Sequence, residues 1–98
     1  MYNIGFDLGS SSVKVALVDA DSGKSIHSIF EPSDEMEILA LNKDWAEQDP
    51  ELWWQYICTA TNRILKEAHI NSSEIKGIGI SYQMHGLVLV DSNQNVIR

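Results

Sequence analysis

The sequence predicts a mixed α/β fold in which an antiparallel β-β-β meander is followed by α-β-β. Five apolar runs have the length of strands, and they lie at residues 2–8, 13–18, 24–30, 75–83 and 87–90. Between the third and fourth runs, residues 50–69 carry apolar side chains at helical spacing. Because Val96 and Ile97 begin another apolar run just before residue 98, we expect the domain to be truncated.

The composition is typical of one small globular domain. The 98 residues are 44% hydrophobic and 21% charged. A formal net charge of -7 argues against nucleic acid or an anionic membrane as a partner. Cys58 is the single cysteine and cannot form an internal disulfide, and the first residues have neither a basic region nor a long apolar run. We therefore expect a cytoplasmic protein without a membrane span.

The first strand, residues 2–8, ends at a polar loop. Its large apolar side chains alternate with small or polar ones, which puts Asp7 at the strand's exit on the face kept uncrowded by Gly5. Gly9 is predicted to supply a positive φ in the turn that follows. Three serines at 10–12 complete this turn.

The second and third strands are predicted to form a hairpin. Residues 13–18 alternate clearly, whereas 24–30 form a weaker strand with Ile26 and Phe30 on one face. The intervening Asp19-Ala20-Asp21-Ser22-Gly23 superficially resembles a calcium loop. Its glycine comes one place early and the late glutamate is missing, so the prediction is a hairpin turn.

An aperiodic, acidic stretch separates the third strand from the helix. Residues 31–48 are predicted to be a solvated loop. The helix then begins with Asp49 as N-cap, Pro50 at the first helical position and Glu51 in the first turn. Apolar and aromatic residues recur at three- and four-residue steps to about residue 69, so one helix face is expected to pack on the sheet.

The last third of the chain holds two apolar runs joined by a polar turn. In residues 75–83, Ile78 and Ile80 alternate with glycines, which makes one face small enough for close approach to the backbone. The continuous run Leu87–Val90 predicts a strand buried on both faces. The turn between these two runs is Gln83-Met84-His85-Gly86.

The loop after the first strand has groups suited to phosphate and metal. Backbone N–H groups and hydroxyls from Gly9, Ser10, Ser11 and Ser12 can donate to phosphate, and Lys14 can supply countercharge. Asp7 can hold a hydrated Mg²⁺, which commonly takes one or two carboxylates and keeps its waters. The stretch is not a P-loop. By itself, such a Gly/Ser turn is more often an ordinary hairpin.

The Gln83–Gly86 turn has groups suited to a polyhydroxy compound. His85 can donate and accept hydrogen bonds with sugar hydroxyls, and Met84 offers an adaptable apolar wall. A lone histidine is usually structural, so the residues by themselves favour a structural role for His85.

Three segments, in this order, make nearly the whole chain resemble the N-terminal part of the FGGY carbohydrate kinases. They are Ile4–Lys14, Trp45–Trp54 and Ile78–Asp91. The first alone also fits other actin-like ATPases, including chaperone-type domains, whereas the second and third together are specific. Within the family, Gln83-Met84-His85-Gly86 is most similar to the stretch found in xylulokinases.

The resemblance implies a ribonuclease H-like, actin-type ATPase fold, with residues 1–98 as a fragment of the N-terminal domain. It implies ATP and Mg²⁺ as cofactors and phosphorylation of a ketopentose, D-xylulose to D-xylulose 5-phosphate. Asp7 would belong to the metal site. The phosphate-binding residues would be Gly9, Ser10, Ser11, Ser12 and Lys14. The sugar-binding residues would be Gln83, Met84 and His85.

The family's catalytic base lies downstream of these residues, so the chain alone is expected to be inactive. Because sheet neighbours would be missing, it is also expected to self-associate. Two alternatives stay open. One is a non-enzymatic sugar- or nucleotide-sensing module, and the other is a kinase of the same family with another ketopentose or a polyol as substrate.

Overall fold

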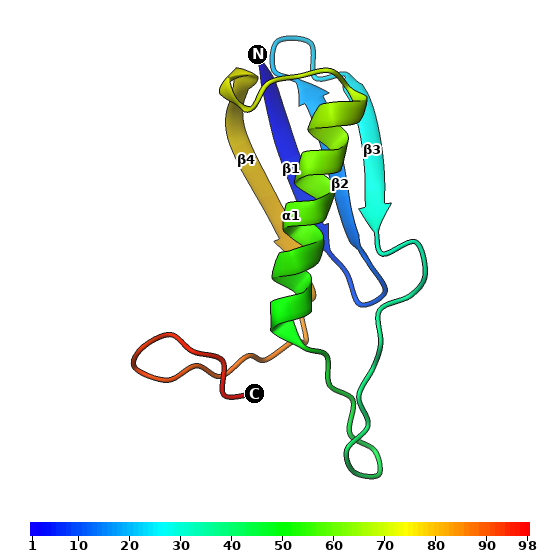
Figure 1. The fold of residues 1–98 in the computed structure, drawn as a ribbon, viewed down its shortest axis with the longest axis vertical. Coiled ribbons are helices and arrows are strands. Elements are labelled where there is room, and N and C mark those ends of the chain that lie inside the picture. Colours follow the sequence, from blue (N-terminus) through cyan, green and yellow to red (C-terminus); the bar gives the residue numbers. More distant parts are fainter.

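The computed structural model describes residues 1–98 and contains a four-stranded sheet with one long helix on it (Figure 1). The elements are β1 (Tyr2–Leu8), β2 (Val13–Asp19), β3 (Ser25–Glu31), α1 (Pro50–Glu67), a 3-10 turn (Ser72–Glu74) and β4 (Ile75–Tyr82). The strand order is β3-β2-β1-β4. The first three strands are antiparallel, which confirms the predicted meander, and β4 runs parallel to β1.

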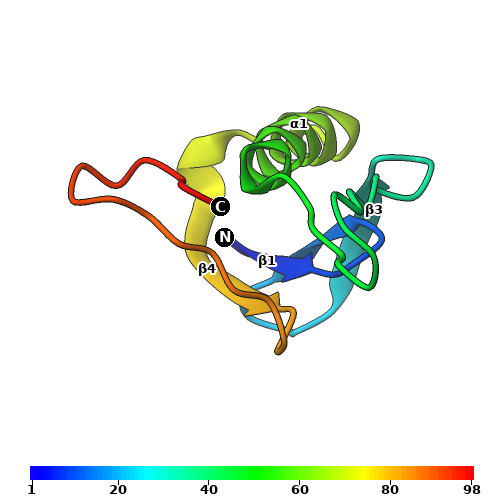
Figure 2. The same ribbon diagram turned by 90° about the horizontal axis from the view of Figure 1, so that it is seen from below.

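The core lies between α1 and one face of the sheet (Figure 2). Strand register puts Val15 beside both Phe6 and Ile29, and the helix adds Ala60 and Ile64. The buried core residues are Ile4, Phe6, Val13, Val15, Leu17, Ile29, Ala60 and Ile64. Burying each large side chain among them contributes about 1.5–3 kcal/mol, so the helix is fixed against the sheet by this face.

The core residue of β3 is Ile29, and not Ile26 or Phe30, whose spacing predicted this strand in the sequence. Ile26 and Phe30 are both about half exposed, and Ile29 is the buried residue. The cause is register, because Val15 pairs with Ile29 and a pairing irregularity follows at Leu17. A single strand's alternation cannot show which of its two faces a helix will cover.

Local signals set both ends of α1. The Asp49 carboxylate accepts a hydrogen bond from the Glu51 N–H at 3.0 Å, which confirms the predicted N-cap. The regular helix ends at Glu67, slightly before the predicted end. His69 takes a left-handed conformation with φ 57°, and the Ile70 N–H donates to the Leu65 carbonyl at 3.0 Å, so the chain leaves the helix through a Schellman-type turn.

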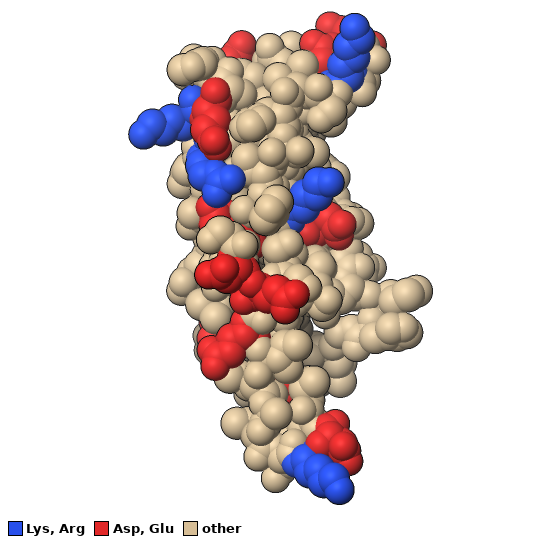
Figure 3. All heavy atoms as spheres, turned by 90° about the vertical axis from the view of Figure 1, so that its right-hand side faces the viewer, with Lys and Arg blue, Asp and Glu red and all other residues tan.

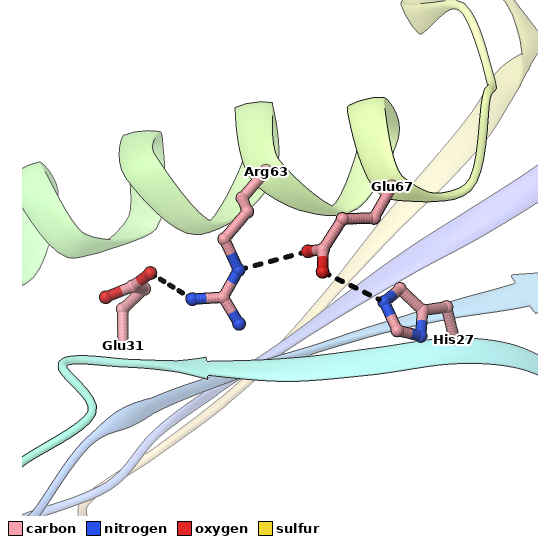
Figure 4. Close-up of polar contacts among 4 residues, drawn as sticks. All are labelled: His27, Glu31, Arg63 and Glu67. Atoms are coloured by element: carbon pink, nitrogen blue, oxygen red, sulfur yellow. Dashed lines mark hydrogen bonds and ion pairs between the residues drawn. The ribbon is translucent and has the colours of Figure 1, made fainter.

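A chain of polar contacts links α1 to β3 (Figure 4). Arg63 on the helix pairs with Glu31 on the strand and, at 3.1 Å, with Glu67 one turn along. Glu67 in turn lies 3.8 Å from the imidazole of His27. Desolvation works to lower the pKa of Arg63, but its hydrogen bonds to Glu67 and Glu31 raise that pKa above the usual value. The cation therefore stays charged and ties the helix to the outer strand.

The segment between β3 and α1 is a loop, as predicted. Its regular pairing is limited to a bridge between Leu39 and Glu47. Met36 is buried, and its N–H donates to the Ser11 carbonyl at 2.8 Å, so the loop is attached to the turn after β1. Figure 3 shows basic and acidic side chains scattered together over the face of the molecule that it draws.

Leu87–Val90 do not form the predicted strand in this chain, and the burial expected of them in a larger sheet is not present among residues 1–98. These residues are 37–78% exposed and lie outside the sheet. They form one arm of a loose hairpin, in which Leu89 bonds to the backbone of Ile97 and Arg98 (Figure 1). The physical reason is that, within residues 1–98, no strand lies on the outer edge of β4 for this run to join, so nothing buries its two faces. None of the helices combines the length and apolar character needed to cross a membrane.

Candidate functional site

The two sequence-predicted loops meet at one end of the sheet. Because β1 and β4 are parallel, their carboxyl ends lie at the same edge, close to the start of α1 (Figure 1). A groove of about 390 Å³ opens there. It is lined by Asp7, Leu8, Gly9, Ser10, Tyr82, Gln83, Met84 and His85. Six of these eight were predicted as site residues from the sequence, and the fold brings them together.

The loop after β1 is polarised. Its carbonyl groups are occupied within the chain: Ser11 accepts from the Met36 N–H at 2.8 Å and Ser12 accepts from the Gly9 N–H at 3.0 Å. By contrast, the N–H groups of Ser10, Ser11 and Ser12 donate to no other backbone group. A loop with occupied acceptors and free donors presents partial positive charge, which suits an anion such as phosphate.

Gly9 is needed for space rather than for a positive φ, which corrects the prediction made for it. Its φ is not in the left-handed region, where among the glycines only Gly23 lies. A Cβ on Gly9 would come 3.2 Å from the Ser12 carbonyl oxygen, closer than such contacts normally are. The tight turn therefore depends on the missing side chain. Gly23 instead shapes the hairpin turn that begins at Asp19, which confirms the hairpin reading of that stretch.

Asp7 is exposed at the edge of the groove, and its Oδ1 accepts a hydrogen bond from the Ser81 hydroxyl at 3.1 Å. No group of three or more His, Cys, Asp or Glu residues gathers around it or elsewhere. An exposed carboxylate with an open side fits a hydrated Mg²⁺ that takes its other ligands from water and phosphate. Lys14 is the partner of Asp7 across β1 and β2 but does not line the groove.

The predicted sugar segment presents two side chains to solvent. Met84 is 84% exposed, and His85 is exposed on the groove and also lines a larger cavity of about 910 Å³ beside it. That cavity lies between the loop before α1 and the C-terminal hairpin, and the Arg98 guanidinium covers the Trp45 ring there at 4.6 Å. His85 is thus placed to reach a ligand from either side.

Gln83 differs from its neighbours because it is half-buried and already engaged. Its backbone N–H donates to the Leu8 carbonyl at 3.0 Å, and its Nε2 donates to the Gly9 carbonyl at 3.0 Å. The same Nε2 lies 3.2 Å from the side-chain oxygen of Gln48. The Oε1 of Gln83 accepts no hydrogen bond within the chain and remains open to a hydroxyl.

Gln48 is a site residue that the sequence argument missed. It lies next to the helix N-cap, and its Nε2 donates to the Ser10 carbonyl at 2.5 Å. Its Oε1 accepts from the Trp53 indole at 3.2 Å as well as from Gln83. In the sequence, Gln48 closes a stretch predicted to be a solvated loop, and nothing local indicates that it reaches back 38 residues to Ser10.

The arrangement of the sheet, helix and two loops is that of a carbohydrate kinase N-terminal region. The structure superposes on the crystal structure of a xyloylose kinase from Brucella ovis with a TM-score of 0.88 and 33% identity, over 100% of this chain and 20% of that one. Residues 2–98 match the FGGY family of carbohydrate kinases, N-terminal domain. The chain therefore belongs to this family and has its ribonuclease H-like, actin-like ATPase fold.

Sequence relatives agree with the structural match. The chain is 38% identical to xylulose kinase of Escherichia coli over 97 residues, which are 97% of this chain and 18% of that protein. It is 37% identical to xylulose kinase of Bacillus subtilis over 97 residues, 99% of this chain and 19% of that protein. The chain thus spans about a fifth of the length of these relatives.

Proposed function

We propose that these residues form the first part of the N-terminal domain of an ATP-dependent sugar kinase that phosphorylates D-xylulose to D-xylulose 5-phosphate. The observation that carries the proposal is the single groove onto which a polarised, phosphate-type loop and the Met84-His85 pair both open. Phosphoryl transfer needs both substrates held side by side, so this convergence fits a kinase better than either loop would alone. A single cysteine favours the cytoplasm as its compartment.

The residues divide into two roles at this groove. Free N–H groups of Ser10, Ser11 and Ser12 would hold nucleotide phosphate oxygens, with Lys14 nearby as countercharge. Asp7 would hold Mg²⁺, which supplies charge neutralisation for the phosphates. Met84 and His85 would contact the ketopentose, with His85 exchanging hydrogen bonds with its hydroxyls. No catalytic base is assigned to residues 1–98, so we expect the isolated chain to transfer no phosphoryl group.

The test uses the uninterrupted reading frame that contains this chain. Mg-ATP-dependent phosphorylation is measured over D-xylulose, L-xylulose, D-ribulose, L-ribulose and glycerol. We expect D-xylulose to have the highest kcat/KM. Preference for another of these compounds would keep the kinase and reject the substrate, and Tyr82 in the groove wall would be the first residue to examine. No turnover on any of them, with nucleotide or sugar binding retained, would favour the sensing module.

His85 gives a sharper test of the sugar segment. In the whole enzyme, His85→Ala should raise the KM for the sugar about tenfold or more, because a hydroxyl loses its partner, while the KM for Mg-ATP should change little. His69→Ala is the control, since His69 is also exposed but lies just after α1, at the end of the helix far from the groove. Equal sugar KM values for the two variants would remove His85 from the site.

A further inference from the structure

Three consecutive carbonyls at the end of β1, those of Leu8, Gly9 and Ser10, accept hydrogen bonds from two glutamine residues. Leu8 and Gly9 accept hydrogen bonds from Gln83, through its backbone N–H and its Nε2, both at 3.0 Å. The next carbonyl, on Ser10, accepts from Gln48 Nε2. The two side chains, here called the glutamine pair, also contact each other at 3.2 Å. Three consecutive peptide groups of the candidate phosphate loop are thereby fixed.

Trp53 sets the orientation of the Gln48 amide. An indole N–H is only a donor, so the atom of Gln48 that faces it at 3.2 Å must be the oxygen. The amide nitrogen of Gln48 then faces the Ser10 carbonyl, and its oxygen also receives the Gln83 donor. The network is self-consistent, and Gln48 cannot reverse its amide without losing all three contacts.

Fixing these carbonyls aims the donors of the loop. In a trans peptide, the C=O of one residue and the N–H of the next point in opposite directions. With the Gly9 and Ser10 carbonyls held toward the glutamine pair, the N–H groups of Ser10 and Ser11 point away from it. These are two of the three free donors of the loop. The glutamine pair therefore aims these two donors outward for an anion, whereas the carbonyl of Ser11 is held by the Met36 N–H.

We propose that Gln48 is a positioning residue that holds the phosphate loop in its donor-outward form and links it to the sugar segment. The link is short, because Gln83 contacts Gln48 and directly precedes Met84 and His85. Gln48 itself touches neither reacting group in this role. The inference rests on the proposed kinase function and adds to it a residue from the segment before α1.

Two substitutions in the whole enzyme separate this role from simple support of the fold. Gln48→Met removes every polar contact of the amide at similar length. Gln48→Glu keeps an oxygen for the Trp53 and Gln83 donors but loses the donor to Ser10. Gln55→Met is the matched control, because Gln55 is an exposed helix residue with no hydrogen bond of its own side chain. Melting temperature and circular dichroism report whether each variant folds.

For both Gln48 variants we expect kcat to fall about tenfold to a hundredfold, as for misplaced catalytic groups. The KM for the sugar should stay within about threefold, since Met84 and His85 keep their places. A wild-type kcat in Gln48→Glu would overturn the proposal. It would mean that accepting the Trp53 and Gln83 donors is sufficient and that the hydrogen bond from residue 48 to the Ser10 carbonyl is not needed. A kcat for a folded Gln48→Met equal to that of Gln55→Met would also overturn it. If Gln48→Met does not fold, Gln48→Glu decides alone.

Failure of the kinase function itself has a different signature. Wild-type enzyme that transfers phosphate to no sugar would reject the proposed function, and the loop is then tested by Mg-ADP titration calorimetry. Weaker Mg-ADP binding by Gln48→Glu than by the wild type would still support the positioning role. Equal affinities, or no binding by the wild type, would overturn it.

Discussion

Asp19 organises the turn of the β2–β3 hairpin through one carboxylate oxygen. Its Oδ1 accepts from the N–H groups of Asp21 and Ser22 at 3.0 and 2.8 Å and from the Ser22 hydroxyl at 3.1 Å. The backbone hydrogen bonds from Ser22 and Asp21 lower the pKa of the Asp19 carboxyl below its ordinary value. The ionised form is therefore the one that the folded hairpin prefers.

This preference predicts a pH-dependent contribution to stability. Because the folded pKa is lowered, the contribution is present above the unfolded value of about 3.9 and is lost as the pH falls through the folded pKa. Asp19→Asn should thus destabilise the chain at pH 7, and this effect should shrink progressively as the pH falls below the unfolded pKa, measured by urea unfolding. Asp21→Asn is the control. A difference that stays constant with pH would contradict the prediction.

Gly9 offers a second test at the scale of one residue. In Gly9→Ala the new methyl would lie 3.2 Å from the Ser12 carbonyl oxygen, so the loop must open by a few tenths of an ångström. Unfolding free energy should change by about 1 kcal/mol or less, whereas kcat of the whole enzyme should fall about tenfold or more, because the loop donors move. Gly79→Ala is the control, since nothing lies within 4 Å of its added methyl. Equal kcat values for the two variants would show that the loop tolerates opening.

At the scale of elements, α1 connects the stable part of the fold to the site. Its C-terminal half, at Ala60 and Ile64, is fully buried on the sheet. Just before its start, Gln48 bonds to Ser10 and Gln83 of the groove wall and accepts from the Trp53 indole of the first turn. Because a helix is stiff, holding its C-terminal half also fixes the direction of its N-terminal half. Gln48 is therefore held in a fixed position relative to the core, and so is its hydrogen bond to the phosphate loop.

The N-cap of this helix should have a measurable share in stability. Asp49→Ala removes the acceptor for the Glu51 N–H and should lower the free energy of unfolding by about 1 kcal/mol. Asp34→Ala, in the exposed loop, is the control. Urea unfolding followed by far-ultraviolet circular dichroism measures both. No difference between the two variants would mean that Pro50 and the packing define the helix start without the cap.

At the scale of the molecule, the sheet is covered unevenly. Register puts Ile78 and Ile80 of β4 beside Ile4 and Phe6 on the helix-facing side, but α1 packs mainly over β2 and β3. Ile78 and Ile80 are consequently 67% and 68% exposed, and Tyr82 beyond them is also exposed. The outer edge of β4 has no strand beside it. An apolar strip next to an open edge favours pairing with another chain.

We therefore expect the isolated chain to self-associate. Light scattering over a range of concentrations should show a mass that rises with concentration. Replacing both residues, Ile78→Lys with Ile80→Lys, should reduce the association strongly. Ile26→Lys, which removes an exposed apolar side chain from β3 instead, should not. A monomer at every concentration would refute the expectation.

Local patterns in the sequence determined the elements and the chemistry of the two loops. The alternation of β1 and β2, the Asp49-Pro50 helix start and the polar turns depend on neighbours within a few residues, so they can be read without a fold. The family resemblance, carried by motifs in order, added the fold and the family, which the comparisons confirm. These predictions agree with the structure because each depends on short-range geometry or on a sequence motif.

Only the tertiary structure decided which distant residues meet. The pairing of β4 with β1, the burial of Ile29 and the exposed position of Leu87–Val90 depend on register and on which surfaces find a partner. The contacts of Gln48 with Ser10 and of Gln83 with Gly9 cross 38 and 74 residues. A glutamine amide carries no periodic or charge signal, so its partners follow from the closure of the sheet and helix around it.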